Sequence, residues 1–399
     1  MTVKRGRSFL MTPGPTPVPE RILNAMHRQP IDYNGPELIA LARSCLEDLR
    51  PIFKTAAPVF VYTASGHGAW EAALSNTLSP GDRILVPESG NFSLGWAEMA
   101  EALGIEAIYL ESDWRHAVDP DQVEARLAED RGHEIKAVLM VHTDTATGIT
   151  SDVPALRRAI DRAGHPALLM VDTIASLATT DFRMDEWQVD VAVGASQKGL
   201  MMPPGLSFTA ASEKALHAAE TAVMPRRYWD WRERRQEPAY KWFCGTAPEH
   251  LLFALREAID MVTEEGLEAI FARHARLAEA VRRAVAVWAE DGALAFNALV
   301  PEARANSVTT ILTSQGVDAD RVRVTCRESF DVALGAGLRK LDGRAFRIGH
   351  MGDINEPTIL GALASVEAAL KTCGVPHGAG GVTAAIEFLA ACAEPSPTS

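Results

Sequence analysis

The fold is decided by the segment Val191-Ala192-Val193-Gly194-Ala195-Ser196-Gln197-Lys198-Gly199, which Pro203-Pro204-Gly205 follows closely. The small apolar residues 191–194 are typical of a buried strand in a parallel sheet. A lysine on the tight turn that follows would lie at the carboxyl edge of that sheet, where open α/β folds bind ligands. Lys198 is therefore the first candidate functional residue. Taken alone, a solvated loop lysine is the commoner interpretation.

Apolar runs of strand length alternate along the chain with segments of helical period, which favours a mostly parallel sheet covered by helices. The predicted strands are 83–87, 107–110, 137–142, 167–172, 191–194 and 206–210. The predicted helices between them include 68–78, 94–103 and 153–163. One long helix over 251–288 is expected to bridge to a second region, in which 307–312 and 346–349 are predicted strands.

A chain of 399 residues is too long for one compact core, so we expect two domains of unequal size. We predict an N-terminal arm (1–20), a large α/β domain (21–265) and a smaller α+β domain (266–393). Residues 394–399, which include two prolines and two serines, are expected to form a flexible tail.

Composition narrows the class of protein. The formal net charge of −13 argues against nucleic acids and anionic membranes as partners. No apolar run reaches membrane-spanning length, and no signal peptide is indicated. The five cysteines are widely spaced and lack CxxC pairing, so neither a disulfide framework nor a metal site is indicated. We expect a cytoplasmic protein that acts on small molecules.

An acidic residue ends one of the predicted apolar strands. Asp172 follows Leu168-Leu169-Met170-Val171. Such a residue can simply form a turn or a cap. Its burial is costly unless it has a cationic partner, and the protonated pyridine nitrogen of pyridoxal 5′-phosphate (PLP) would be one. That pairing is also what makes PLP an electron sink.

A turn rich in small residues, Thr63-Ala64-Ser65-Gly66-His67-Gly68, lies between an apolar run and a predicted helix. Small residues let backbone N–H groups approach a phosphate, and the helix N-terminus adds its dipole. A turn of this kind is weak evidence by itself. His67 alone is more often a capping or packed histidine than a functional one.

Three more positions add to the candidate functional residues. Phe92, in Gly90-Asn91-Phe92-Ser93, is suited to stacking on a flat ring or to packing in the core. The segment 142–148 adds hydroxyls, among them Thr145, which are either turn residues or ring contacts. Arg347 places a charge inside the apolar strand 346–349, where it could bind a carboxylate bidentately or form an inter-strand ion pair. Together these positions are far more specific than any one of them.

The sequence resembles the class V aminotransferases of PLP fold type I, and within them the serine–glyoxylate and alanine–glyoxylate branches. The resemblance covers nearly the whole chain. It includes Pro13-Gly14-Pro15-Thr16, Gly68-Ala69-Trp70-Glu71, Ser79-Pro80-Gly81-Asp82, Thr147-Gly148, Val171-Asp172, Ser196-Gln197-Lys198-Gly199, Pro203-Pro204-Gly205, Leu334-Gly335-Ala336-Gly337-Leu338 and Phe346-Arg347-Ile348-Gly349-His350. The resemblance implies a mostly parallel seven-stranded sheet, a smaller C-terminal domain, PLP as cofactor and a homodimer with active sites near the subunit interface.

Residue by residue, Lys198 matches the lysine that holds PLP as a Schiff base, and Asp172 matches the acid that pairs with the pyridine nitrogen. The resemblance implies further cofactor contacts at Ser65, Gly66, His67, Phe92, Thr145, Ile174 and Gln197. Arg347 matches the arginine that binds the substrate carboxylate. Thr246 matches a phosphate contact donated by the neighbouring subunit.

The chain departs from the serine–glyoxylate pattern at several positions. It has Asp32-Tyr33-Asn34 where that branch has Asp-His-Arg, and Ser65-Gly66-His67-Gly68 where it has Thr-Gly-Thr-Gly. Phe243 and Gly245 lie near the position where a tyrosine is expected. We therefore expect Tyr33 and Asn34 to contribute to substrate binding, while His67 resembles the alanine–glyoxylate side.

The predicted function is transfer of an amino group from serine, alanine or a similar amino acid to glyoxylate or pyruvate by a ping-pong mechanism. A pyridoxamine–pyruvate aminotransferase remains an alternative. A cysteine desulfurase would need a mobile thiol such as Cys326, yet Val322, Cys326 and Phe330 recur with the spacing of one helix face. A nicotinamide-binding protein is disfavoured because no GxGxxG motif follows the early strands. A catalytically silent binding protein would be expected to lose Lys198 or Asp172.

Overall fold

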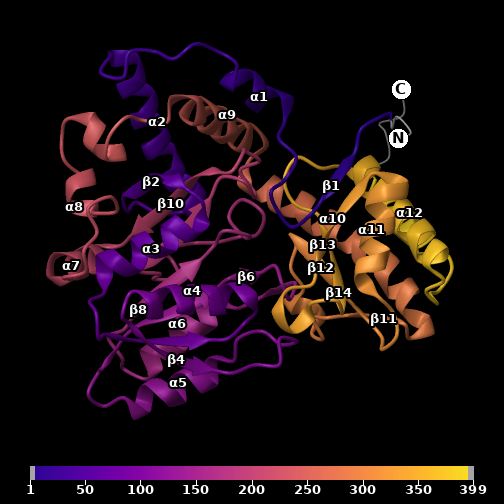
Figure 1. The fold of residues 1–399 in the computed structure, drawn as a ribbon. Helices are drawn as coiled ribbons and strands as arrows, with labels where there is room; N and C mark the ends of the chain where they lie inside the picture. The colour runs from indigo at the N-terminus through magenta and orange to yellow at the C-terminus, as the bar shows by residue number, and fades with distance from the viewer. Residues whose placement is uncertain (1–4, 394–399) are drawn as a thin grey trace.

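The computed structural model describes residues 5–393, and the predicted tail at 394–399 lies outside them. Two β-sheets organise these residues, and Figure 1 shows them in separate parts of the molecule. The larger sheet has the order β2 (Val59–Ala64), β10 (Gly205–Ala211), β9 (Val191–Ala195), β8 (Leu168–Asp172), β5 (Ile135–Val141), β3 (Arg83–Pro87) and β4 (Glu106–Leu110). Its strands are parallel except for β10, which runs antiparallel to both neighbours. The predicted mostly parallel, seven-stranded sheet is therefore confirmed.

Helices bury both faces of this sheet. Apolar residues of α2 (Pro36–Phe53), α5 (Pro120–Glu129), α6 (Val153–Arg162) and α9 (Glu249–Glu265) pack on one face. Those of α3 (Gly66–Thr77), α4 (Asn91–Ala102) and α7 (Glu213–Thr221) pack on the other. Because both faces are covered, most residues of the central strands are apolar and buried, which is the pattern that predicted them.

The smaller sheet has the order β1 (Phe9–Met11), β13 (Val332–Ala336), β14 (Ala345–Gly349), β12 (Val308–Thr313) and β11 (Leu294–Phe296). It shares one core with α10 (Leu267–Trp288), α11 (Ala319–Phe330), α12 (Glu356–Cys373) and α13 (Gly381–Cys392). β1 pairs parallel with β13, although Phe9 and Val332 are far apart in the sequence. The sequence did not predict this strand, because three residues are too few for a periodic pattern.

Shorter elements complete the described chain. They are α1 (Glu20–Met26), α8 (Trp231–Arg234), the hairpin strands β6 (Thr143–Asp144) and β7 (Ile149–Thr150), and the 3₁₀ turns η1 (Ala239–Phe243), η2 (Ala289–Asp291), η3 (Pro301–Ala303) and η4 (Arg339–Leu341). No helix between residues 5 and 393 is long and apolar enough to cross a membrane.

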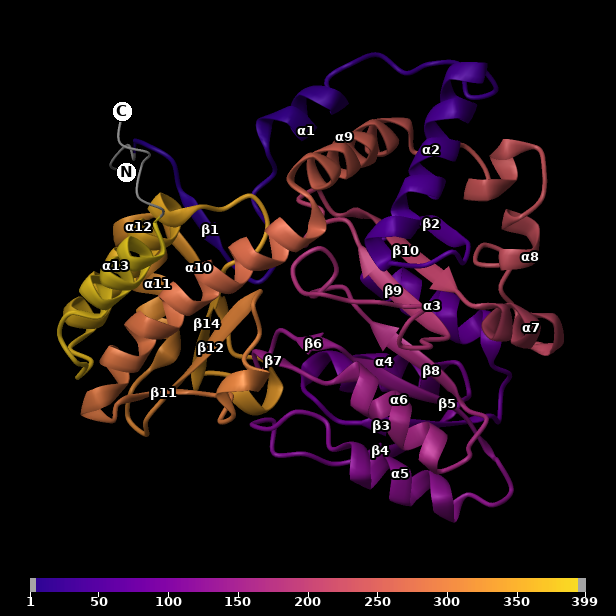
Figure 2. The same ribbon diagram turned by 180° about the vertical axis from the view of Figure 1, so that it is seen from behind.

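The single helix predicted over 251–288 is wrong. Two helices, α9 and α10, meet at Gly266, whose φ of 82° no continuous right-handed helix allows. Glycine adopts this conformation without steric cost and so ends α9. Figure 2 shows α10 running from the end of α9 to the smaller sheet, so the bridging role predicted for this stretch belongs to α10.

Candidate active site

A cavity of about 230 Å³ opens where strands of the larger sheet end. Val141 and Asp172 lie at the carboxyl ends of β5 and β8, and the N-terminus of α3 faces the same space. Its lining comprises Gly14, Ser65, Gly66, His67, Trp70, Phe92, Val141, Thr143, Thr145, Asp172, Ile174, Ala175, Gln197 and Lys198. The structure therefore brings all the cofactor contacts predicted from the sequence to one cavity, with the exception of Thr246.

Lys198 lies on the turn between β9 and β10, where its Nζ donates a hydrogen bond to the carbonyl oxygen of Pro13. A Cβ atom on Gly14, whose φ is +99°, would lie 2.3 Å from that Nζ, so only glycine lets the N-terminal segment pass this close. Burial lowers the pKa of Lys198 to about 8; the nearby Arg347 adds to this and Asp172 opposes it. A larger fraction of the amine is thus neutral and nucleophilic near neutral pH.

Asp172 is the last residue of β8 and is buried. Its Oδ1 accepts the backbone N–H of Ile174 at 2.7 Å, and its Oδ2 accepts the indole N–H of Trp70 at 2.8 Å. Burial raises the pKa of Asp172 to about 7, although both donors oppose the shift. The carboxyl group therefore has the turn contact considered from the sequence and is also held against the cavity, where a cation would favour its charged form.

The first turn of α3 presents backbone donors to the cavity. Ser65 is its N-cap residue, and its side chain makes no capping hydrogen bond in the described chain. A Cβ atom on Gly66 would lie 2.4 Å from Cδ1 of Ile174, so a larger residue there would force that side chain to shift. The Oε1 atom of Gln197 is buried without a hydrogen-bond partner among the described residues. Unpaired N–H groups at a helix N-terminus favour an anion.

Asp144 holds the start of α4 and with it Phe92. Its carboxylate accepts the backbone N–H of Phe92 at 2.9 Å and that of Ala146 at 2.9 Å. Burial raises the pKa of Asp144 to about 6, against these donors and the charge of Arg347. The sequence did not single out Asp144, although it is a polar residue just beyond the end of β5.

Arg347 lies in β14 of the smaller sheet and is 8% exposed. Its Nε donates to the carbonyl oxygen of Ala336 at 2.6 Å and its Nη1 to that of Thr145 at 2.9 Å. No carboxylate of residues 5–393 lies within ion-pair distance of it, so the inter-strand ion pair considered from the sequence is wrong. Arg347 borders the cavity through Thr145 and does not itself line it.

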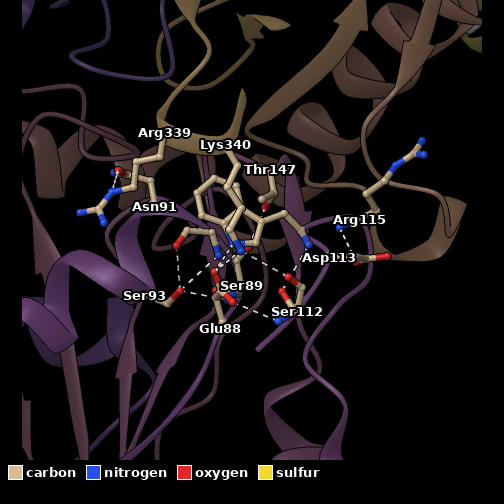
Figure 3. Close-up of polar contacts among 12 residues, drawn as sticks. Glu88, Ser89, Asn91, Ser93, Ser112, Asp113, Arg115, Thr147, Arg339 and Lys340 are labelled. Atoms are coloured by element: carbon tan, nitrogen blue, oxygen red, sulfur yellow. Dashed lines mark hydrogen bonds and ion pairs between the residues drawn. The ribbon is translucent and has the colours of Figure 1, made fainter. Parts of the chain in front are cut away.

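Polar contacts join the turn η4, between β13 and β14, to Glu88 and Asn91 of the larger domain (Figure 3). Arg339 binds both carboxylate oxygens of Glu98 at 2.6 Å and also donates to Asn91. Lys340 donates to Oε1 of Glu88 at 2.7 Å, and Glu88 also accepts the indole N–H of Trp114 at 2.7 Å. These contacts fix the loop after β13 against the large sheet, and Ala336, the last residue of β13, supplies one of the two carbonyl partners of Arg347.

Glu88 is expected to stabilise the folded protein at pH values above the pKa of its carboxyl group. Its burial opposes ionisation, but Lys340 and the N–H groups of Ser112 and Trp114 outweigh burial and lower the pKa. A lowered folded-state pKa means that the stabilisation is present at neutral pH and is lost as the pH falls through that pKa. Glu88→Gln should therefore reduce the free energy of unfolding by about 1–3 kcal/mol at pH 7, and by less in acid. Urea denaturation at both pH values tests this; a difference that grows in acid would contradict it.

Tyr33, Asn34 and Thr246 are not brought to the cavity of the chain that carries them. Tyr33 is 56% exposed and lines a separate shallow hollow with Tyr240, Phe243 and Gly245. Asn34 and Thr246 are also exposed. Residues 33 and 245 therefore border one outer surface, away from Lys198.

Trp70 also lines the cavity, although the sequence indicated it only as part of the motif Gly68-Ala69-Trp70-Glu71. It lies three residues after His67 on α3, and this spacing places both rings on one helix face. The sequence signal that could have identified Trp70 is its position three residues after His67, which belongs to the turn rich in small residues.

The desulfurase alternative loses support because Cys326 is fully buried on α11 in the smaller core and burial raises its thiol pKa to about 12. Phe330, predicted to share that packed face, is instead 38% exposed.

A partly buried lysine and a buried carboxylate at the carboxyl edge of a doubly covered sheet, beside a smaller α+β region, are typical of an α/β enzyme with an amine-handling site. The chain belongs to the class V aminotransferase family, whose model matches residues 8–341. It is accordingly an aminotransferase.

Individual relatives agree with this assignment. The chain is 44% identical over 395 residues to a serine–glyoxylate aminotransferase of Methylorubrum extorquens, covering 97% of both chains. It is 41% identical over 380 residues to an L-aspartate–glyoxylate aminotransferase of Paracoccus denitrificans, covering 95% of both. Its fold matches a solved ureidoglycine–glyoxylate aminotransferase from Bacillus subtilis with a TM-score of 0.88 and 26% identity, covering 98% of this chain and 100% of that one.

Proposed function

We propose that the enzyme uses PLP, bound covalently to Lys198, to transfer amino groups from a small amino acid to glyoxylate. The observation that carries the proposal is the presence of Lys198 and Asp172 in one cavity, each with a pKa shifted by burial toward its neutral form. Cavities of this kind, with convergent ionisable groups, are the usual sites of catalysis.

The residues present fit PLP. The unpaired donors of the first turn of α3 suit its phosphate. Asp172 suits the protonated ring nitrogen, and Phe92 and Ile174 supply apolar surface for the ring. When bound, PLP supplies an electron sink for the charge that develops at the substrate Cα.

The protein's own groups then have distinct tasks. The Nζ of Lys198 would accept the proton from the substrate Cα and deliver it to the cofactor carbon, since a proton returned to the same Cα would only regenerate the donor. Asp172 would keep the ring nitrogen charged. Arg347 binds the substrate α-carboxylate, since it has no carboxylate partner among residues 5–393. Two half-reactions that share one site should give ping-pong kinetics.

The donor is proposed to be serine or alanine, in keeping with the serine–glyoxylate relative. A second carboxylate, as in aspartate, would need a second cation in the cavity. Of the basic side chains that line it, Lys198 is needed for chemistry and burial lowers the pKa of His67, which disfavours its charged form.

We therefore expect a higher kcat/KM with serine or alanine than with aspartate or pyridoxamine, measured with glyoxylate and then with pyruvate as acceptor. A preference for aspartate would contradict the donor assignment. A preference for pyridoxamine would favour the alternative aminotransferase named from the sequence. Neither result would affect the assignment of Lys198.

We also propose that the active form is a homodimer in which Thr246 of one subunit contacts the phosphate site of the other. The support is that Thr246 matches a cross-subunit contact in the family resemblance, is exposed, and lies outside the cavity of the chain that carries it.

The acidic composition and the widely spaced thiols support a cytoplasmic location. The break at Gly266 supports a domain boundary near residue 265.

Activity should consequently fall on dilution as the dimer dissociates. Mass photometry and steady-state rates measured on the same dilution series test this, because specific activity should track the dimer fraction. A monomer with full specific activity would contradict the proposal.

A further inference from the structure

Trp70 contacts three of the residues assigned to the cofactor. Its indole N–H donates to Oδ2 of Asp172 at 2.8 Å. Its ring lies 4.5 Å from that of His67 and packs edge-on against Phe92 at 6.4 Å between centroids. The side chain is buried, so these contacts are made without competition from solvent.

The hydrogen bond from the Trp70 indole is one of two that the Asp172 carboxylate accepts. Oδ1 of Asp172 is held by the backbone N–H of Ile174, and Oδ2 is held by Trp70, so each carboxylate oxygen has one fixed donor. A carboxylate clamped at both oxygens cannot rotate about its Cβ–Cγ bond without breaking a buried hydrogen bond, which is costly. Each oxygen keeps a further lone pair for another partner.

We propose that Trp70 is a positioning residue, which fixes the carboxylate plane of Asp172 toward the cofactor ring and braces Phe92 beside it. The inference rests on the proposed function, because the ring toward which Asp172 would be fixed is that of PLP. Trp70 touches no reacting atom; it acts through Asp172.

The chain offers a matched control. Trp96, on α4, stacks on Trp70 with 6.0 Å between centroids and is equally buried. Its indole Nε1 has no hydrogen-bond partner among the described residues. Trp70→Phe and Trp96→Phe therefore remove the same atoms from the same core, but only the first removes a donor to Asp172.

The experiment compares these variants for PLP affinity of the apoenzyme, for kcat and KM, and for thermal stability. Trp70→Phe should weaken PLP binding and lower kcat by about 10- to 100-fold, the usual effect of losing a hydrogen bond to a charged group. Trp96→Phe should change both by less than about threefold while losing comparable stability. Equal effects of the two variants would overturn the proposal.

A double-mutant cycle tests whether Trp70 acts through Asp172. In an Asp172→Asn background, Trp70→Phe should add less than about threefold, since the carboxylate it orients is gone. Full additivity would contradict the positioning role. If Trp70→Phe does not fold, Trp70→Met fills the space with an apolar chain that also lacks a donor, and the same comparison applies.

Failure of this inference is distinct from failure of the proposed function. If the wild-type protein binds no PLP, the cofactor assignment is wrong. If the wild-type protein binds PLP and transaminates while Trp70→Phe behaves like Trp96→Phe, only the role of Trp70 is wrong.

Discussion

Replacing Lys198 with alanine is expected to reduce transamination by about three powers of ten or more, because the group that moves the Cα proton is removed. The cavity, the α3 N-terminus and Asp172 remain, so PLP should still bind, now without a covalent link. The measurements are turnover and mass spectrometry after borohydride reduction, which should fix PLP to the wild type and not to Lys198→Ala.

Lys214 provides the control for this variant. Its Nζ also donates to a backbone carbonyl, that of Ala167, and pairs with Asp190, both of which precede strands of the large sheet and so lie at its opposite edge. Lys214→Ala should therefore keep its turnover and its reducible PLP adduct. Normal turnover in Lys198→Ala would remove this lysine from the mechanism.

The second large effect is expected at Arg347. Arg347→Lys keeps the charge but loses the planar fork that binds a carboxylate through two parallel hydrogen bonds. It should reduce kcat/KM for every amino acid donor by about one to three powers of ten, or about 1.4–4 kcal/mol of transition-state binding. PLP occupancy should be unchanged, because the assigned cofactor contacts lie on other residues.

A purely structural role for Arg347 predicts a different outcome. Its hydrogen bonds to Ala336 and Thr145 would then matter only for stability, and the folded variant would show normal kinetics. Arg282→Lys is a suitable comparison, since Arg282 also donates to backbone carbonyls in the smaller part, at Arg304 and Ala305. Lost stability with unchanged kcat/KM in Arg347→Lys, as expected for Arg282→Lys, would place Arg347 outside the active site.

Most of the large sheet could be predicted from the sequence, because its strands are short, mostly apolar runs between helical segments. The predicted strand 83–87 coincides with β3, and the other predicted strands of this sheet differ from the observed bounds by one or two residues. The break at Gly266 was missed because a single glycine is tolerated inside many helical patterns, and only the backbone conformation shows that this one ends α9.

The sequence by itself determined the strand-to-turn segment that ends in Lys198, the apolar strand that ends in Asp172, and the small residues before α3. These are local features, since each depends on residues adjacent in the chain. The tertiary structure alone decided that Gly14 lies against Lys198 and that Trp70 donates to Asp172. It also decided that Tyr33 lies outside its own chain's cavity. Contacts between segments far apart in the sequence depend on how whole elements pack, and no local pattern encodes that packing.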